Sequence, residues 1–284
     1  MWQRTFGVGN ISVRVQSEHN DCSRDIDAIT SLFQDSEAKP SLTFSIRNNH
    51  NIQLSVNDDE LWQSHNAGEI TAAFEVHLYS RIVHELVPEL ASIHAAAVGI
   101  HHQACVFAGI SDAGKSSICT KAVIEGASYL SDEFALLNQS GKIEPFPRPL
   151  QWGKEEHPAF THAMMAEAGI KQARFRFPDK QGNEITALLW LPEHVQHEPL
   201  PLCHIIFPRF DDSIASPELA PVRRGEALME LPQHLHQQQR ADIMLQMLNQ
   251  RIPKETTFHR IRFSDVHAAW KLLEKELFSS GNAD

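Results

Sequence analysis

The sequence predicts an α/β fold with a small α+β lobe at the N-terminus, a central sheet that carries a glycine-rich loop, and a helical C-terminus. Three features predict it. Before residue 65, short stretches alternate apolar and polar residues, as half-buried strands do. Two strongly apolar stretches then lead into a glycine-rich segment that is followed by an amphipathic helix. The tail contains two amphipathic helical segments, 238–251 and 264–278.

The N-terminal lobe is expected from three strands and one helix. Alternation predicts strands at 10–17, 41–48 and 51–58. The polar segment "NNHN" between the last two predicts a hairpin. Between the first strand and this hairpin, apolar residues at helical spacing predict a helix over 25–33. Ser23 is its expected N-cap.

A second helix separates this lobe from the rest of the chain. From Ile70 to Leu86, apolar side chains recur at every fourth residue or so, which predicts a helix over 70–87. We place a domain boundary just before this helix. Residues 1–68 are then the N-terminal lobe, and residues 69–284 are the second domain.

The middle of the chain predicts buried strands around a loop. Apolar stretches at 92–100 and 104–109 predict two strands joined by a short turn. A helix that begins near Lys115 is expected to end at Gly126, and 128–137 predicts a strand with two acids in its middle. Strand, loop, helix and strand thus follow in the order of a βαβ unit. Two further strands are predicted at 185–191 and 202–208.

Composition is that of an ordinary globular protein, with 284 residues, 42% hydrophobic and 21% charged. The formal net charge is −11 and there is no long basic run, so we expect no nucleic-acid partner. No stretch approaches the ~18 apolar residues of a membrane helix, and the start lacks a signal-peptide pattern, so we expect a cytoplasmic protein without a membrane partner. The four cysteines are scattered, which indicates neither a disulfide framework nor a redox pair.

The segment "GISDAGKS" satisfies the phosphate-loop (P-loop) motif G-x-x-x-x-G-K-[ST]. Its glycines let backbone N–H groups reach phosphate oxygens, and the positive end of the following helix adds to the attraction. Lys115 is then expected to reach the β- and γ-phosphates, and the Ser116 hydroxyl to hold Mg²⁺. We therefore predict binding of ATP with Mg²⁺. The candidate binding residues are Gly109, Ser111, Asp112, Ala113, Gly114, Lys115, Ser116 and Ser117.

Asp112 is an unusual residue for a loop that binds anions. Because the backbone amides hold the phosphates, its side chain can point to solvent, where repulsion costs on the order of 1 kcal/mol. Asp also tolerates the left-handed backbone conformation better than most residues do. We therefore expect Asp112 to weaken nucleotide binding without abolishing it.

Asp132 and Glu133 follow the P-loop helix in the stretch "YLSDEFALL". Phosphoryl transfer needs a carboxylate for Mg²⁺ and often a second one that accepts the proton of the attacking hydroxyl. Acids in an apolar strand are costly to bury without a reason. In a regular strand, adjacent side chains point to opposite faces, so one of the two acids could face away from the site.

These segments resemble a known family. "SIHAAAV", "FAGISDAGKSS" and "YLSDEFALL" are similar to the core of bacterial HPr kinase/phosphorylase and of the HPr-kinase-related proteins. The resemblance is specific over about residues 90 to 150. It implies a P-loop kinase core related to phosphoenolpyruvate carboxykinase and a metal-dependent transfer of phosphate to a hydroxyl. It also implies Asp132 as general base with support from His94. Lys115 then completes the catalytic set. Ser116 and one of the two carboxylates are expected to hold the metal; we assign Glu133 to the metal and Asp132 to the base, and the reverse assignment of the two acids stays open.

Two arginines share the context Phe-Pro-Arg. Arg148 and Arg209 could stabilise the charge of a transferring phosphate, but surface ion pairs are an equal alternative for each. The segment that HPr kinase uses for phosphorolysis is absent, so the reverse reaction is not expected.

The sequence thus predicts an ATP-dependent kinase whose partner is a protein or peptide with an acceptor serine. Two alternatives stay open. The chain could be a nucleotide-binding module that docks a partner without catalysis, or a kinase whose acceptor is a small metabolite. HPr kinase is an oligomer, and the sequence leaves a homo-oligomer open.

Overall fold

A computed structural model of the chain describes residues 1–48, 50–86, 89–152, 157–179, 181–236 and 240–279. The chain forms two compact units. The first unit comprises Met1–Pro88, Gln151–Glu155 and Lys171–Leu191, and the second unit comprises Glu89–Leu150, Glu156–Ile170 and Pro192–Asp284.

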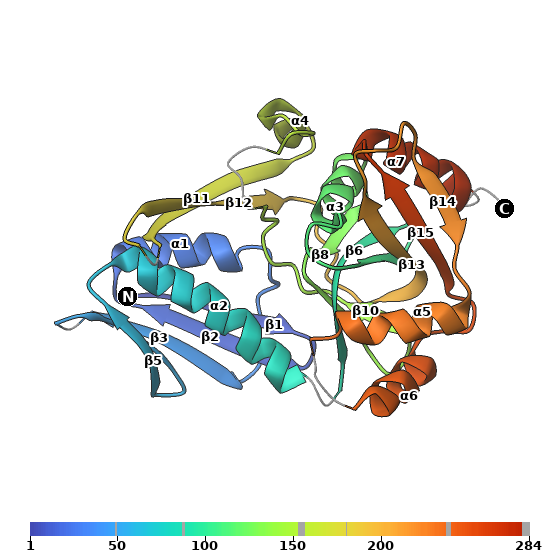
Figure 1. The fold of residues 1–284 in the computed structure, drawn as a ribbon. Coiled ribbons are helices and arrows are strands. Elements are labelled where there is room, and N and C mark those ends of the chain that lie inside the picture. The colour runs from blue at the N-terminus through green and yellow to red at the C-terminus, as the bar shows by residue number, and fades with distance from the viewer. Residues whose placement is uncertain (49, 87–88, 153–156, 180, 237–239, 280–284) are drawn as a thin grey trace. The chain divides into compact units, whose positions relative to one another are not determined.

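The first unit contains a five-stranded sheet in the order β1-β2-β3-β4-β5. Its strands are β1 (Trp2–Val8), β2 (Ile11–Ser17), β3 (Leu42–Asn48), β4 (Ile52–Val56) and β5 (Asp59–Ser64). Neighbouring strands are antiparallel except β2 and β3, which are parallel. Helices α1 (Asn20–Thr30) and α2 (Ala67–Leu86) pack together on this sheet (Figure 1).

The three strands and the hairpin expected here are confirmed, because β3 pairs with β4 in antiparallel register. Strands β1 and β5 were not predicted. The outer strand β5 is largely exposed on both faces, so it lacks the alternation that marks a half-buried strand.

The predicted N-cap of the first helix was wrong. Helix α1 begins five residues before the expected start, and its N-cap is His19, whose Nδ1 accepts the Cys22 N–H at 3.5 Å. The hydroxyl of Ser23 lies inside the first turn and donates to the carbonyl oxygen of His19 at 2.8 Å. A histidine cap is rare enough that sequence rules favour a nearby serine.

The division of the chain differs from the expected boundary between residues 68 and 69. Helix α2 packs on strands of the first sheet, so it belongs to the first unit. Strands β11 (Ile170–Pro178) and β12 (Glu184–Pro192) form a two-stranded sheet that lies almost wholly in the first unit. A side chain at Gly68 would overlap the Arg176 carbonyl oxygen, so a glycine allows α2 and β11 to approach closely.

The second unit is built on an eight-stranded sheet whose main path runs β10-β9-β6-β7-β13-β15-β14, with β8 paired to β6. The strands are β6 (Ala91–Ile100), β7 (Gln103–Ala108), β8 (Ser128–Ser131), β9 (Phe134–Leu137), β10 (Lys142–Glu144), β13 (Leu200–Phe210), β14 (Glu218–Pro221) and β15 (Thr257–Phe263). Strands β7, β13 and β15 are parallel to one another, whereas β6 is antiparallel to β7.

Helices cover both faces of this sheet (Figure 1). The second unit contains the helices α3 (Lys115–Ile124), α4 (His162–Glu167), α5 (Arg224–Glu230), α6 (Ala241–Arg251) and α7 (Val266–Leu273) and the helical turns η1 (Leu231–His234) and η2 (Glu274–Phe278), of which α4 stands apart from the sheet in Figure 1. Ala227 of α5 and Leu248 of α6 join one buried cluster with Val106 of β7. Helices α3 and α7 pack together, and α3 packs on β6 and β7. The fold is therefore α/β, as predicted.

The expected helical C-terminus is only partly correct. Helices α6 and α7 occupy the predicted segments, apart from residues 238 and 239, which lie outside the described part of the chain. Between these helices, however, β15 enters the sheet beside β13. This strand carries Arg260 and Arg262, whose charges hide its apolar pattern. Both arginines are held by acids of neighbouring elements.

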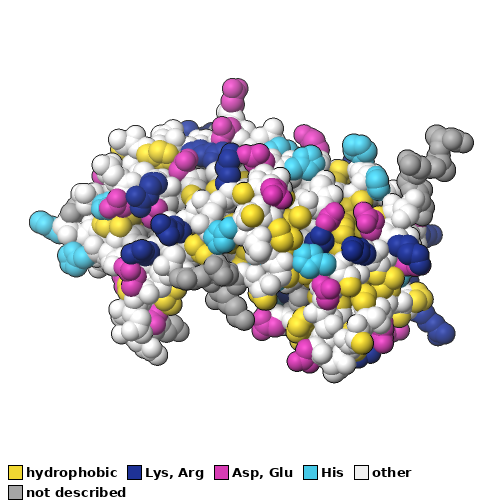
Figure 2. Space-filling view, turned by 90° about the horizontal axis from the view of Figure 1, so that it is seen from above, with side chains coloured by type: hydrophobic (Ala, Val, Ile, Leu, Met, Phe, Trp, Pro, Cys, Tyr) yellow, Lys and Arg dark blue, Asp and Glu magenta, His cyan; other side chains and the backbone are white. Residues whose placement is uncertain are grey.

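Charged side chains are mixed on the surface. On the face that Figure 2 shows, basic and acidic side chains are interspersed rather than gathered by sign. Among the described residues, no helix is both long and apolar enough to cross a bilayer.

Candidate functional site

The P-loop connects β7 to the N-terminus of α3, as the motif requires. Gly114 is the N-cap of α3 and has a φ of +92°, a conformation that side chains rarely adopt. A Cβ at this position would also lie 2.5 Å from the Phe263 ring. Both the backbone turn and the packing against β15 therefore require glycine here.

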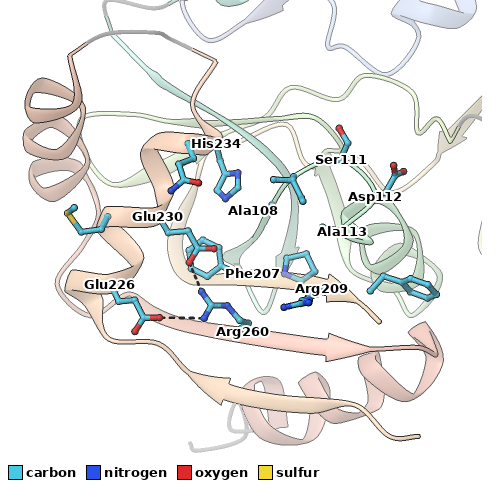
Figure 3. A pocket seen from close by; sticks show the side chains of 16 residues that line it. Ala108, Ser111, Asp112, Ala113, Phe207, Arg209, Glu226, Glu230, His234 and Arg260 are labelled. Atoms are coloured by element: carbon cyan, nitrogen blue, oxygen red, sulfur yellow. Dashed lines mark hydrogen bonds and ion pairs between the residues drawn. The ribbon is translucent and has the colours of Figure 1, made fainter. Parts of the chain in front are cut away.

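Asp112 has the left-handed backbone that we expected, with a φ of +61°. Its side chain is exposed, and Figure 3 shows it directed away from the cavity that the loop borders. The expectation that this carboxylate points to solvent is confirmed. Ser111, which precedes it, is also exposed.

Lys115 is folded back over its own loop. Its side chain is only 6% exposed, and its Nζ donates to the Ile110 carbonyl oxygen at 2.8 Å. Burial lowers the pKa of Lys115, and the carboxylates of Glu133, Asp132 and Asp112 oppose this shift. The ammonium group thus lies within electrostatic range of all three acids.

The acidic pair lies at a break in what was predicted as one strand, 128–137. That prediction was wrong, because β8 and β9 are separate strands that both pair with β6. At the break, the carbonyl oxygen of Glu133 accepts the Ala95 N–H at 3.2 Å. Strict alternation does not apply at this irregular point, so Asp132 and Glu133 need not face opposite ways.

Asp132 is 3% exposed, and its Oδ1 has no hydrogen-bond partner among the described residues. Burial raises the pKa of this carboxyl from 3.8 to about 7. Arg148, the Ser116 side chain and Lys115 oppose that rise, whereas Glu133 adds to it. A buried carboxyl oxygen without a partner is costly, which indicates that a ligand or a proton completes its environment.

Glu133 joins His94 to Arg148. Its Oε1 lies 3.2 Å from His94 Nε2, and its Oε2 lies 3.8 Å from Arg148 Nη1. Burial alone would raise the pKa of Glu133, but the His94 hydrogen bond and the Arg148 charge lower it below its ordinary value. The resemblance implies that His94 supports Asp132, whereas its side-chain contact in the structure is with Glu133.

The two arginines have different surroundings. Arg148 is 15% exposed and acts on both acids, so it is not a surface ion pair. Arg209 is exposed and forms no ion pair with any residue that the structure describes. It lies beside the P-loop, because the N–H of Phe210 donates to the Ala113 carbonyl oxygen at 3.1 Å.

The two serines after Lys115 also differ. The hydroxyl of Ser117 hydrogen-bonds His157 Nε2 at 2.8 Å, so that side chain is engaged outside the loop. Ser116 instead lies close enough to Asp132 to lower the pKa of its carboxyl. Of the two hydroxyls, that of Ser116 is therefore the one that lies beside the acid pair.

Two histidines that sequence reasoning missed lie next to this cluster. Leu235 forms an isolated bridge with Ile93 of β6, which brings His234 and His236 to the site. His236 Nδ1 lies 3.0 Å from the Ser92 hydroxyl, and burial lowers the pKa of both histidines. Only this long-range pairing reveals them, because no motif in the sequence surrounds them.

A cavity of about 780 Å³ borders the P-loop in the second unit (Figure 3). Its walls come from residues 108–113 of the loop, 207–210 at the end of β13, the α5–η1 segment and Arg260 of β15.

No protein-family model and no curated protein matches the chain. The function of the site therefore has to be inferred from its own geometry.

Proposed function

We propose that the second unit is an ATP-dependent kinase that transfers the γ-phosphate to a hydroxyl group, the serine of a protein or peptide. The observation that carries this proposal is the buried Asp132 carboxyl beside Ser116 and Lys115, at the N-terminus of a helix that begins with a P-loop. We also propose the P-loop kinase core that the resemblance to HPr kinase implies. The parallel arrangement of β7 and β13 around the loop supports it.

The residues present fit a Mg²⁺ ion. Ser116 offers a hydroxyl oxygen, and the His94 hydrogen bond and the Arg148 charge lower the pKa of Glu133, which favours its carboxylate form. Hard oxygen donors of this kind are those that Mg²⁺ prefers. When bound, Mg²⁺ would offset the negative charge of the phosphates. Ser116 and Glu133 are the proposed ligands.

The chain's own groups can support an in-line transfer. Asp132 takes the proton of the acceptor hydroxyl, whose oxygen forms a bond to the γ-phosphorus while the bond from that phosphorus to the bridging oxygen of ADP breaks. A carboxyl with a pKa of about 7 suits a general base that works near neutral pH. Lys115 and the N-terminal amides of α3 bind the phosphates, and the exposed cation of Arg209 can offset charge at the loop.

Nucleotide binding is tested by calorimetry with Mg-ATP. The wild-type protein should show saturable binding, and Lys115→Ala should weaken it at least about tenfold, because a charge-assisted contact is lost. Lys142→Ala is the matched control, since Lys142 is an exposed lysine on β10 of the same unit. Equal affinity in all three proteins would contradict a nucleotide site at the P-loop.

Transfer is tested with γ-labelled ATP and a cell lysate. Asp132→Asn should keep nucleotide binding and reduce labelling by roughly 10² to 10⁴, as expected for loss of a general base. Unchanged labelling would remove Asp132 from the mechanism. Binding with no label transferred by the wild-type protein would favour the non-catalytic module, and label found only in small molecules would favour a metabolite kinase.

A further inference from the structure

The cavity of about 780 Å³ and the acid pair lie on different sides of the P-loop. Within the sheet, β6 separates β7 from β8 and β9, between which Asp132 and Glu133 lie. Strand β13 borders β7 on its other edge, and the cavity walls include the end of β13 and Arg260 of β15. Along the sheet, the P-loop therefore lies between the acids and this part of the cavity.

This order sets the direction of a triphosphate bound at the loop. Under the proposed function, the γ-phosphate points toward Asp132, which takes the proton of the acceptor hydroxyl. A triphosphate chain that lies over the loop then has its α-phosphate on the β13 side, where the cavity lies. The volume of the cavity is within the range that holds ligands of several hundred daltons, so it has room for more than a phosphate group.

The charges of the cavity differ between the loop and the wall that α5 and β15 form. At the loop, the exposed Arg209 forms no ion pair with any described residue, and the carboxylate of Asp112 points away from the space (Figure 3). On the other wall, the Arg260 guanidinium lies 3.4 Å from Glu226 Oε1 and 2.5 Å from Glu230 Oε2. One cation facing two carboxylates disfavours a phosphate there, whereas the loop side attracts one.

His234 offers a hydrogen-bonding group inside the cavity. It is 6% exposed, it lines the cavity, and no hydrogen bond joins its imidazole to any residue in the described part of the chain. Burial, together with the charges of His94 and Lys115, lowers the pKa of His234 and favours the neutral ring. A neutral imidazole has one N–H donor and one acceptor nitrogen, whereas phosphate is bound most strongly by charged donors. The ring therefore suits the hydroxyls and ring nitrogens of a nucleoside better than it suits a phosphate.

We propose that this cavity holds the ribose and base of the nucleotide whose phosphates lie on the P-loop, and that His234 hydrogen-bonds to this nucleoside. The inference rests on the proposed kinase function and adds how the site distinguishes a nucleotide from a simple polyphosphate. A nucleoside has apolar ring faces as well as polar edges. The cavity offers apolar surface too, because the ring of Phe207 lines it, with its centroid 6.4 Å from that of His234.

The test compares Mg-ATP with the Mg²⁺ complex of inorganic tripolyphosphate, by calorimetry on the full chain. The wild-type protein should bind Mg-ATP at least about tenfold more tightly, since only ATP carries a nucleoside. His234→Ala should weaken Mg-ATP binding about three- to tenfold, as the loss of one hydrogen bond allows, and leave tripolyphosphate binding unchanged. His234→Gln, which keeps a hydrogen-bonding group, should lose less. His197→Ala is the matched control, because His197 is an exposed histidine of the same unit outside the cavity.

A second measurement depends on no variant. After irradiation with 8-azido-ATP and Mg²⁺, the wild-type chain should carry the label in the cavity walls, at residues 207–210 or 226–234. An excess of ATP should prevent this labelling. Label confined to peptides outside the cavity would overturn the proposal.

The outcomes separate this inference from the proposed function. Equal wild-type affinities for Mg-ATP and tripolyphosphate, or a preference for ATP that is unchanged in His234→Ala, would refute the nucleoside site while a phosphate site at the P-loop stands. An equal loss of affinity for both ligands in His234→Ala would also refute it, because His234 would then act on the phosphates or on the fold. If neither ligand binds to the wild-type protein, both proposals fall.

Discussion

Replacing Asp132 by Asn should change how the stability of the protein depends on pH. The carboxyl has a pKa of about 7 in the folded protein, against an ordinary value of 3.8. At pH values between 3.8 and about 7, the Asp132 carboxyl is ionised in the unfolded chain but protonated in the folded protein. The folded state therefore binds more protons, and stability falls as pH rises through this window. An amide side chain at this position has no titratable proton to lose, so the variant lacks this dependence.

The magnitude follows from the size of the shift. A shift from 3.8 to about 7 corresponds to about 4 kcal/mol of unfavourable free energy at high pH. Only part of this free energy develops between pH 5 and pH 8. The Asp132 carboxyl of the unfolded chain is already ionised at pH 5, so the rest of the loss in stability has occurred below that pH. Over this range, the free energy of unfolding of the wild-type protein should drop by roughly 3 kcal/mol relative to the Asn variant.

Chemical denaturation without nucleotide or Mg²⁺ at several pH values measures this difference directly. For a unit of this size, the corresponding relative shift in Tm is roughly 5–10 °C. Asp212→Asn is a suitable control, because Asp212 is an exposed acid of the same unit. A stability difference between Asp132→Asn and wild type that stays constant from pH 5 to pH 8 would refute the raised pKa and the base role built on it.

Two further predictions concern the P-loop itself. Gly114→Ala should destabilise the protein by roughly 2–4 kcal/mol in denaturation experiments, because the added Cβ strains a φ of +92° and meets the Phe263 ring at 2.5 Å. Unchanged stability would contradict that packing. Asp112→Asn should raise the affinity for Mg-ATP up to about fivefold in calorimetry, because it removes a negative charge near the phosphates and tolerates the same backbone. A lower affinity would mean that this carboxylate contributes to binding.

The loop could be predicted from the sequence because its requirements are local. The glycines, the lysine and the left-handed residue at Asp112 stand within eight positions, and each is fixed by backbone geometry or by the helix that follows. The acids after that helix were found for a similar reason, since a charge inside an apolar stretch is visible without a structure. Their arrangement was not visible. Only pairing with β6 shows that β8 and β9 are separate strands.

What the sequence did not reveal depends on contacts between distant segments. His234 reaches the site through the bridge between Leu235 and Ile93, which are far apart in the chain. Strand β15 was hidden because Arg260 and Arg262 interrupt its apolar pattern, and the acids that hold them come from other elements. The first helix shows the same limit, since a cap is recognised by residue type and His19 is not a favoured type.

Burial in the site favours the neutral forms of both the Lys115 ammonium group and the Asp132 carboxyl group. It lowers the pKa of Lys115 and raises the pKa of Asp132. The two charges would stabilise each other, yet Lys115 donates instead to the Ile110 carbonyl oxygen, and Asp132 Oδ1 has no partner among the described residues. A phosphate group favours the charged lysine, and a metal ion favours the charged carboxylate. Under the proposed function, a bound phosphate and a bound metal ion would each offset a cost that the folded protein already carries, and this supports a binding site over a structural ion pair.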